Sequence, residues 1–166
     1  MAQALFINRE DITKFTALNG NIDADKYTQF IKIAQDTHIL GFLGTKLFDK
    51  INDDIVGNTL SGNYATLVTK YIKPMVIHWA MVEYLPFSAY TIANKGVYKH
   101  GSENSDSISI EELNLLIEKE RKIAQSYTQR FLDHINNFSH LYPEYTTNSA
   151  GDKYPERGNQ FTGWMI

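Results

Sequence analysis

The chain has 166 residues, 43% hydrophobic and 13% aromatic, which is enough apolar material for one domain with a full core. It contains no cysteine, so disulfides, thiolate metal sites and a cysteine nucleophile are excluded. With 16 basic and 19 acidic residues, the net charge of −3 provides no overall basic field that would attract nucleic acid.

The first fifty residues predict short helices separated by glycines. We expect a helix over residues 8–18, a turn at residues 19–20, and a second helix with Asp23 as its N-cap. Gly41 and Gly44 should end that helix. A further short helix is expected over residues 45–51, followed by a loop over residues 52–63.

Helical spacing returns from Tyr64, and Pro74 predicts a kink or a break near Lys73. Residues 75–93 form the most apolar stretch and are expected to continue the helix. Because His78, Glu83 and Pro86 interrupt them, we interpret them as a buried core helix and not as a membrane span. The N-terminal residues lack the basic segment and apolar run of a signal peptide.

Residues 94–107 are polar and contain glycine, which indicates either a loop or a short β-hairpin. Ser109 and Glu112 then form a capping box that opens the clearest helix of the chain, predicted to run to Phe138. Its apolar strip begins at Ile110 and follows three-four spacing for about four heptads.

Prolines and glycines exclude a long helix after Phe138, although residues 141–166 still carry many aromatic side chains. We therefore predict a helical domain over residues 1–140 and an extended C-terminal arm over residues 141–166. The expected fold class is mainly α: a small helical bundle with a polar loop or short β-hairpin and the extended arm.

No catalytic, cofactor-binding or metal-ligating residue is predicted, and no cofactor. None of the five histidines forms a tight ligand pair, and His38 and His78 lie on apolar helix faces, as satisfied core histidines do. The carboxylate pairs, such as Asp53–Asp54, are expected to be solvated or to stabilise helix termini. Phosphate-binding loops and nucleophile elbows are absent from the sequence.

Two features point to association: the helix over residues 75–93, apolar on most faces, and the aromatic C-terminal tail. Each has two explanations that the sequence leaves open. One is burial within the chain's own domain; the other is docking on a neighbouring subunit. In the second case Phe161 and Trp164 would be the anchors.

Four segments resemble a family of uncharacterised virion proteins from phages and prophages of Bacteroidetes hosts, including crAss-like phages. They are AQDTHILGFLGTKLFDKI (residues 34–51), KGVYKHGSENSDSISIEEL (95–113), AQSYTQRFLDHINNF (124–138) and LYPEY (141–145). With the helix over residues 64–90, they cover most of residues 5–145. Residues 146–166 match no part of that family.

This resemblance implies a structural virion protein and not an enzyme: a head–tail connector, also called a neck or adaptor ring protein. Such a protein is expected at the head–tail junction, after synthesis in the bacterial cytoplasm, in a dodecameric ring with the portal and other neck or tail proteins as partners. DNA would pass through the channel without specific binding, and no membrane is involved. The expected interface residues are Lys95, Val97, Tyr98, Tyr154, Phe161, Trp164 and Met165.

Besides a DNA-binding regulator, whose salt-sensitive binding the charge balance does not predict, two other hypotheses remain open from the sequence. One is another phage structural protein, such as a tail-completion or capsid-decoration protein. The other is a small helical enzyme with a composite acidic site involving Asp53, Asp54 or Glu120.

Overall fold

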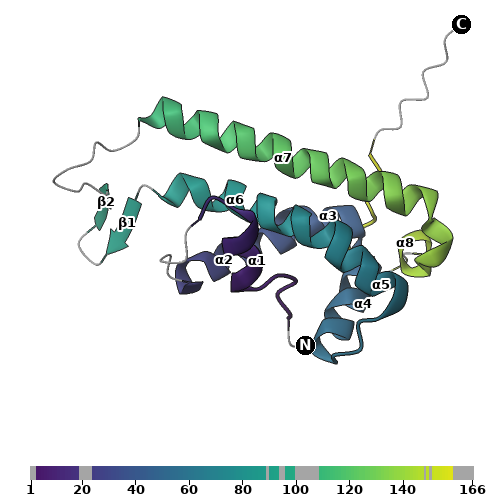
Figure 1. Cartoon of the computed structure of the whole chain (residues 1–166). Coiled ribbons are helices and arrows are strands. Elements are labelled where there is room, and N and C mark those ends of the chain that lie inside the picture. Colours follow the sequence, from purple (N-terminus) through teal and green to yellow (C-terminus); the bar gives the residue numbers. More distant parts are fainter. Residues whose placement is uncertain are drawn as a thin grey trace, which may run out of the picture.

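The computed structural model describes residues 3–18, 24–88, 90–93, 96–99, 109–147, 149 and 151–158. Figure 1 shows two long helices lying along each other, with the other helices gathered below and behind them in this view. The predicted mainly α fold class is confirmed. The helices and helical turns are α1 (Arg9–Phe15), α2 (Ala24–Ala34), η1 (Gln35–Ile39), α3 (Leu40–Leu43), α4 (Thr45–Val56), α5 (Gly62–Leu67), η2 (Val68–Ile72), α6 (Lys73–Ser88), α7 (Ile110–Asn137), η3 (Ser139–Leu141) and α8 (Pro143–Thr146).

Helix α6 lies in the middle of the core, between α7 and α2, and also contacts α1 and η1. Its buried residues lie on nearly every face of the helix: Met75, Val76, Ile77, Trp79, Ala80, Met81 and Val82. The chain's own helices therefore cover this stretch, and burial within the domain explains its apolar composition. None of the described helices is long and apolar enough to cross a lipid bilayer.

The expected continuation of this helix to residue 93 is wrong. Helix α6 ends at Ser88, and strand β1 (Tyr90–Ala93) pairs antiparallel with strand β2 (Gly96–Lys99), with Ala93 opposite Gly96. The sequence Tyr-Thr-Ile favours a strand because β-branched and aromatic residues fit a pleated sheet. The hairpin predicted as one alternative for residues 94–107 thus exists, but it begins at Tyr90.

The break that was predicted from Pro74 near Lys73 does not occur: the helical backbone continues through this residue, and a wider turn precedes it. The π-helical turn η2 ends at Ile72, and α6 begins at Lys73. Pro74 has no N–H to donate, and its ring crowds the carbonyl group four residues earlier, that of Lys70. Local widening of the helix is a recognised way to accommodate such a site.

Helix α4 is longer than predicted. It continues to Val56, although residues 52–56 were expected to belong to a loop. The extra turn is supported by an i,i+4 ion pair between Lys50 and Asp54, at 2.5 Å, and by the burial of Asn52.

Helix α7 begins at the predicted capping box. The Ser109 hydroxyl accepts a hydrogen bond from the Glu112 N–H at 3.1 Å, and the Glu112 carboxylate accepts one from the Ser109 N–H at 2.9 Å. The buried strip of this helix contains Leu113, Ala124, Thr128, Phe131, Leu132 and Ile135. Ile110, assigned to the same strip from the sequence, lies in the first turn of α7 and is 65% exposed.

Residues 141–147 belong to the helical body. Tyr142 and Tyr145 are each 1% exposed and contribute to the main core, and α8 packs against α4. Two fully buried tyrosines are incompatible with an arm that leaves the domain at residue 141. We therefore move the predicted boundary after residue 140 to the C-terminal side of Thr147.

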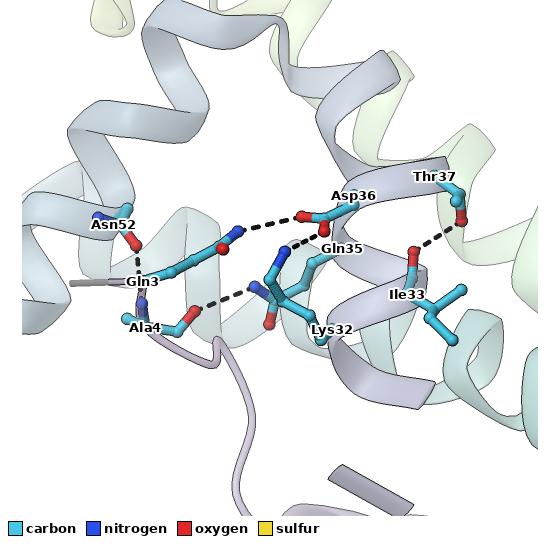
Figure 2. A network of polar contacts seen from close by, with 8 residues as sticks. All are labelled: Gln3, Ala4, Lys32, Ile33, Gln35, Asp36, Thr37 and Asn52. Atoms are coloured by element: carbon cyan, nitrogen blue, oxygen red, sulfur yellow. Dashed lines mark hydrogen bonds and ion pairs between the residues drawn. The ribbon is translucent and has the colours of Figure 1, made fainter. Parts of the chain in front are cut away.

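The N-terminal segment, residues 3–7, is fastened to the body by buried amide side chains (Figure 2). The Gln35 side chain accepts from the Phe6 N–H at 2.8 Å and donates to the Ala4 carbonyl at 3.0 Å. On the other side, the Asn52 side chain accepts from the Ala4 N–H at 2.8 Å. Gln35 is fully buried, so water cannot serve as the partner at this place. The side chain of Gln35 supplies the hydrogen bonds that the backbone of this extended segment would otherwise form with water.

Replacing Gln35 by alanine should leave the Phe6 N–H and the Ala4 carbonyl without partners. An unpaired buried polar group costs about 1–3 kcal/mol, so we expect the free energy of unfolding to fall by at least this amount. Urea denaturation of Q35A would measure the loss. The control is T37A, because Thr37 is exposed on the same helical turn and should change stability by less than about 0.5 kcal/mol. Equal losses in the two variants would contradict the proposed fastening.

Candidate functional site

The C-terminal arm, defined here as residues 151–158, lies as an extended chain against the junction of α3 and α4. The Glu156 N–H donates to the Gly41 carbonyl at 2.9 Å, and the Thr45 N–H donates to the Lys153 carbonyl at 3.1 Å. In addition, the Lys153 N–H donates to the Thr45 hydroxyl at 3.0 Å. Backbone groups at Lys153 and Glu156 thus fix the path of the arm.

Two glycines let the arm approach the body closely. Gly44 has φ +73°, a conformation that L side chains rarely adopt, and a Cβ atom there would lie 2.7 Å from the Pro155 ring. A Cβ atom on Gly41 would lie 2.9 Å from the Glu156 carboxylate. Gly44 ends α3, as predicted, whereas Gly41 lies inside α3 and does not end it. The contact of both glycines with the arm was not predicted. The available signal was a pair of glycines where one suffices to stop a helix.

The arm continues along α7. Gly158 lies close to Leu132, since a Cβ atom on this glycine would be 3.3 Å from the Leu132 side chain. The Asn136 side-chain amide donates to the Arg157 carbonyl at 3.3 Å. At the end of the described arm, the chain is therefore positioned on the flank of α7 that carries Leu132 and Asn136.

Some side chains of the arm contact the body: Asp152 accepts a hydrogen bond from the Thr45 hydroxyl at 3.1 Å, and the Arg157 guanidinium lies over the Tyr145 ring, 5.4 Å from its centroid. Tyr154 is 68% exposed, and only Pro155 is half-buried. Of the other expected interface residues, Val97 and Tyr98 lie in strand β2. Lys95, Phe161, Trp164 and Met165 lie outside the described residues. The structure therefore brings Val97 and Tyr98 together on one strand and places Tyr154 on a separate element.

A second candidate surface lies where α6 ends and α7 begins, beside the hairpin (Figure 1). Large apolar side chains are exposed on these two helix ends: Phe87 at 51%, Ile110 at 65%, Leu115 at 71% and Leu116 at 46%. We call these four residues the hairpin-end residues. Exposed apolar side chains concentrated on one part of a small protein are typical of a contact surface.

The histidines on apolar faces are satisfied within the core, as predicted for His38 and His78. His38 stacks on Trp79, with ring centroids 4.0 Å apart, and its Nε2 lies 2.7 Å from the Glu83 carboxylate. The Nδ1 of His78 lies 2.5 Å from the Glu120 carboxylate. The sequence did not predict these two acidic partners, each of which comes from a position remote in the chain.

His134 has a different environment. Its ring stacks on Tyr71 at 4.2 Å between centroids and is hydrogen-bonded to the Tyr142 hydroxyl at 3.1 Å. Burial, helped by the positive charge of Lys70, lowers the pKa of His134 below its usual value of 6.5. The neutral imidazole is therefore the favoured form in the folded protein.

Within the described part of the chain, no three histidine or acidic side chains are arranged to hold a metal ion. The acidic residues weighed for an enzyme are engaged in other contacts. Asp54 pairs with Lys50 and accepts a hydrogen bond from Thr59, and Glu120 is bonded to His78. The ion-pair partner of Asp54 thus lies on the same helix, α4, and the partner of Glu120 lies on the neighbouring helix α6.

A family model described as a family of unknown function, DUF6712, matches residues 39–155. The match spans more than half of the chain, which therefore belongs to this family. It begins in η1 and ends at Pro155, so it includes Gly41, Gly44 and the arm residue that meets Gly44. No curated protein and no solved structure matches the chain.

Replacing Gly44 by alanine should release the arm. The substitution introduces backbone strain of about 1–3 kcal/mol and a clash with Pro155. We expect faster amide hydrogen exchange at Lys153 and Glu156. A matched control is G62A, because Gly62 also has a positive φ of 57° but has no atom within 4 Å of a Cβ. Unchanged exchange at Lys153 and Glu156 in G44A would contradict the role assigned to this glycine.

Replacing His134 by glutamine should change how stability depends on pH. Since the folded protein has the lower pKa, the unfolded chain binds more protons below pH 6.5, and stability falls as pH decreases from there. Thermal unfolding of wild type and H134Q between about pH 7 and pH 5 would measure this dependence. The variant should lose less stability over that interval. An identical slope in the two proteins would show that His134 does not contribute to it.

Proposed function

We propose that this member of the DUF6712 family is a structural virion protein, a head–tail connector subunit that joins the portal to the tail of a tailed phage. The observation that carries the proposal is the C-terminal arm. Backbone hydrogen bonds at Gly41 and Thr45 hold it on the body, while Tyr154 remains exposed. Beyond the arm, the sequence continues with Phe161, Trp164 and Met165.

The arrangement of the exposed features supports this proposal. The hairpin and the hairpin-end residues lie at one end of the α6–α7 pair, and α8 lies toward the opposite end (Figure 1). A ring subunit needs a rigid body, lateral contact surfaces and extensions that reach other layers. The helical body, the hairpin and the arm provide one candidate for each requirement.

The charge of the chain and its resemblance to virion proteins of Bacteroidetes phages also favour a connector. A net charge of −3 suits a subunit around a DNA channel, because a strongly basic lining would bind phosphates and slow DNA passage. In this proposal the subunit forms a homo-oligomeric ring, contacts the portal and other neck or tail proteins, and lies at the head–tail junction of the virion.

The test is the position and copy number of this protein in purified phage particles. Quantitative mass spectrometry should give about one ring of copies per particle, about twelve for a dodecamer, since closed rings have fixed stoichiometry. Labelled electron microscopy should place them at the vertex where the head meets the tail. A position elsewhere in the particle would favour a tail-completion or decoration protein. Absence from the particle would overturn the proposal altogether.

A further inference from the structure

A groove of about 500 Å³ lies between α1, η2, α6 and α7, away from the arm. Its apolar lining comes from Pro74, Ile77 and Tyr127, and Phe15 is 60% exposed beside them. This volume is within the range of roughly 300–1,000 Å³ that is typical of ligand pockets. The groove can therefore accept at least one large apolar side chain.

Charged side chains of both signs border this apolar lining: the acidic Glu10 and Asp11, and the basic Lys14, Lys73 and Arg130. The Arg130 guanidinium lies over the Tyr127 ring, 5.7 Å from its centroid, and Lys14 also lines the groove. Lys73 forms an ion pair with Asp11 at 2.9 Å, so its charge is neutralised locally. Cations beside an apolar floor suit an aromatic guest, and tryptophan gives the strongest cation–π attraction.

The chain itself contains a segment with the matching chemistry. Residues 159–166, NQFTGWMI, carry Phe161, Trp164 and Met165 but no charged side chain. We call these eight residues the tail. The tail follows directly on the arm, so the described position of Gly158 defines where it starts.

The arm and the groove lie on different flanks of α7. Gly158 contacts Leu132, whereas Tyr127 lines the groove. Because these two α7 residues are five positions apart, their side chains project about 140° apart around the helix axis. The buried strip with Thr128 and Phe131 lies between them and faces the core. The tail of one copy therefore starts on the flank opposite to the one that presents its own groove.

We infer that the groove of one copy binds the tail of a neighbouring copy, with Trp164 or Phe161 as the anchor against Tyr127 and Phe15. A subunit with a tail on one flank and a groove on the other can bind its neighbour head to tail. Such contacts close into a ring when the rotation between copies allows it. This inference rests on the proposed function to the extent that a ring supplies the neighbour. The contact itself is a property of two copies and can be tested without particles.

The experiment uses the 166-residue chain, with one cysteine introduced into each copy, since the sequence has none. Thr69 is exposed and lines the groove, so T69C marks the acceptor, and G163C marks the tail of the donor. Mixing the two chains under mild oxidation should give a T69C–G163C disulfide, because such a bond requires the two Cα atoms to come within about 7 Å. The control acceptor is T37C, an exposed position that does not line the groove.

We expect faster cross-linking of G163C with T69C than with T37C. Adding W164A and F161A to the donor, or F15S to the acceptor, should slow the reaction with T69C by about tenfold, as expected when an anchor is lost. Equal rates with T69C and T37C would overturn the inference. So would a cross-link that forms only within a single chain carrying both T69C and G163C, since the tail would then bind its own groove.

The two proposals can fail separately. A specific T69C–G163C cross-link by a protein that is absent from the head–tail vertex would leave the tail contact standing and overturn the connector proposal. If the protein lies at that vertex but cross-links to T69C and T37C at equal rates, the connector proposal stands and the tail contact is overturned.

Discussion

Helix α6 has apolar side chains on nearly all faces, so the rest of the chain has to cover it from every direction. Helix α7 covers one side and α2 another. At the contact between α6 and α7, the indole N–H of Trp79 donates a hydrogen bond to the Thr128 hydroxyl at 3.0 Å. His38 stacks on the ring of the same tryptophan. The hairpin-end residues lie outside this packed middle, at one end of the helix pair, and the arm lies along the flank of α7.

Local signals predicted much of the fold. The capping box at Ser109 and the regular strip of α7 act within a few residues, so they can be recognised without tertiary information. The strand at Tyr90–Ala93 was assigned to a helix, because a short apolar run has no periodicity that distinguishes the two. The N-terminal fastening was also missed, since Gln35 and its partner Ala4 are 31 residues apart and the pairing exists only in the folded chain.

The candidate site was less predictable than the fold. Aromatic composition did not distinguish core from surface in the C-terminal segment, because Tyr142 and Tyr145 are buried whereas Tyr154 is exposed. The seat of the arm depends on Gly44 meeting Pro155, two residues more than a hundred positions apart, so no local pattern contains it. The proposed connector role rests on a resemblance, because the satisfied histidines and paired carboxylates of the described residues do not specify one function.

The two π-helical turns, Gln35–Ile39 and Val68–Ile72, have a consequence for comparing members of this family. A π-helical turn holds one residue more than an α-helical turn, so it acts as a single-residue insertion inside a continuous helix. A relative with one residue fewer at either place can keep every helix and the same buried faces. A single gap at either position in an alignment would therefore mean that the π-helical turn is replaced by an α-helical turn. The buried residues before and after the gap would still face the core.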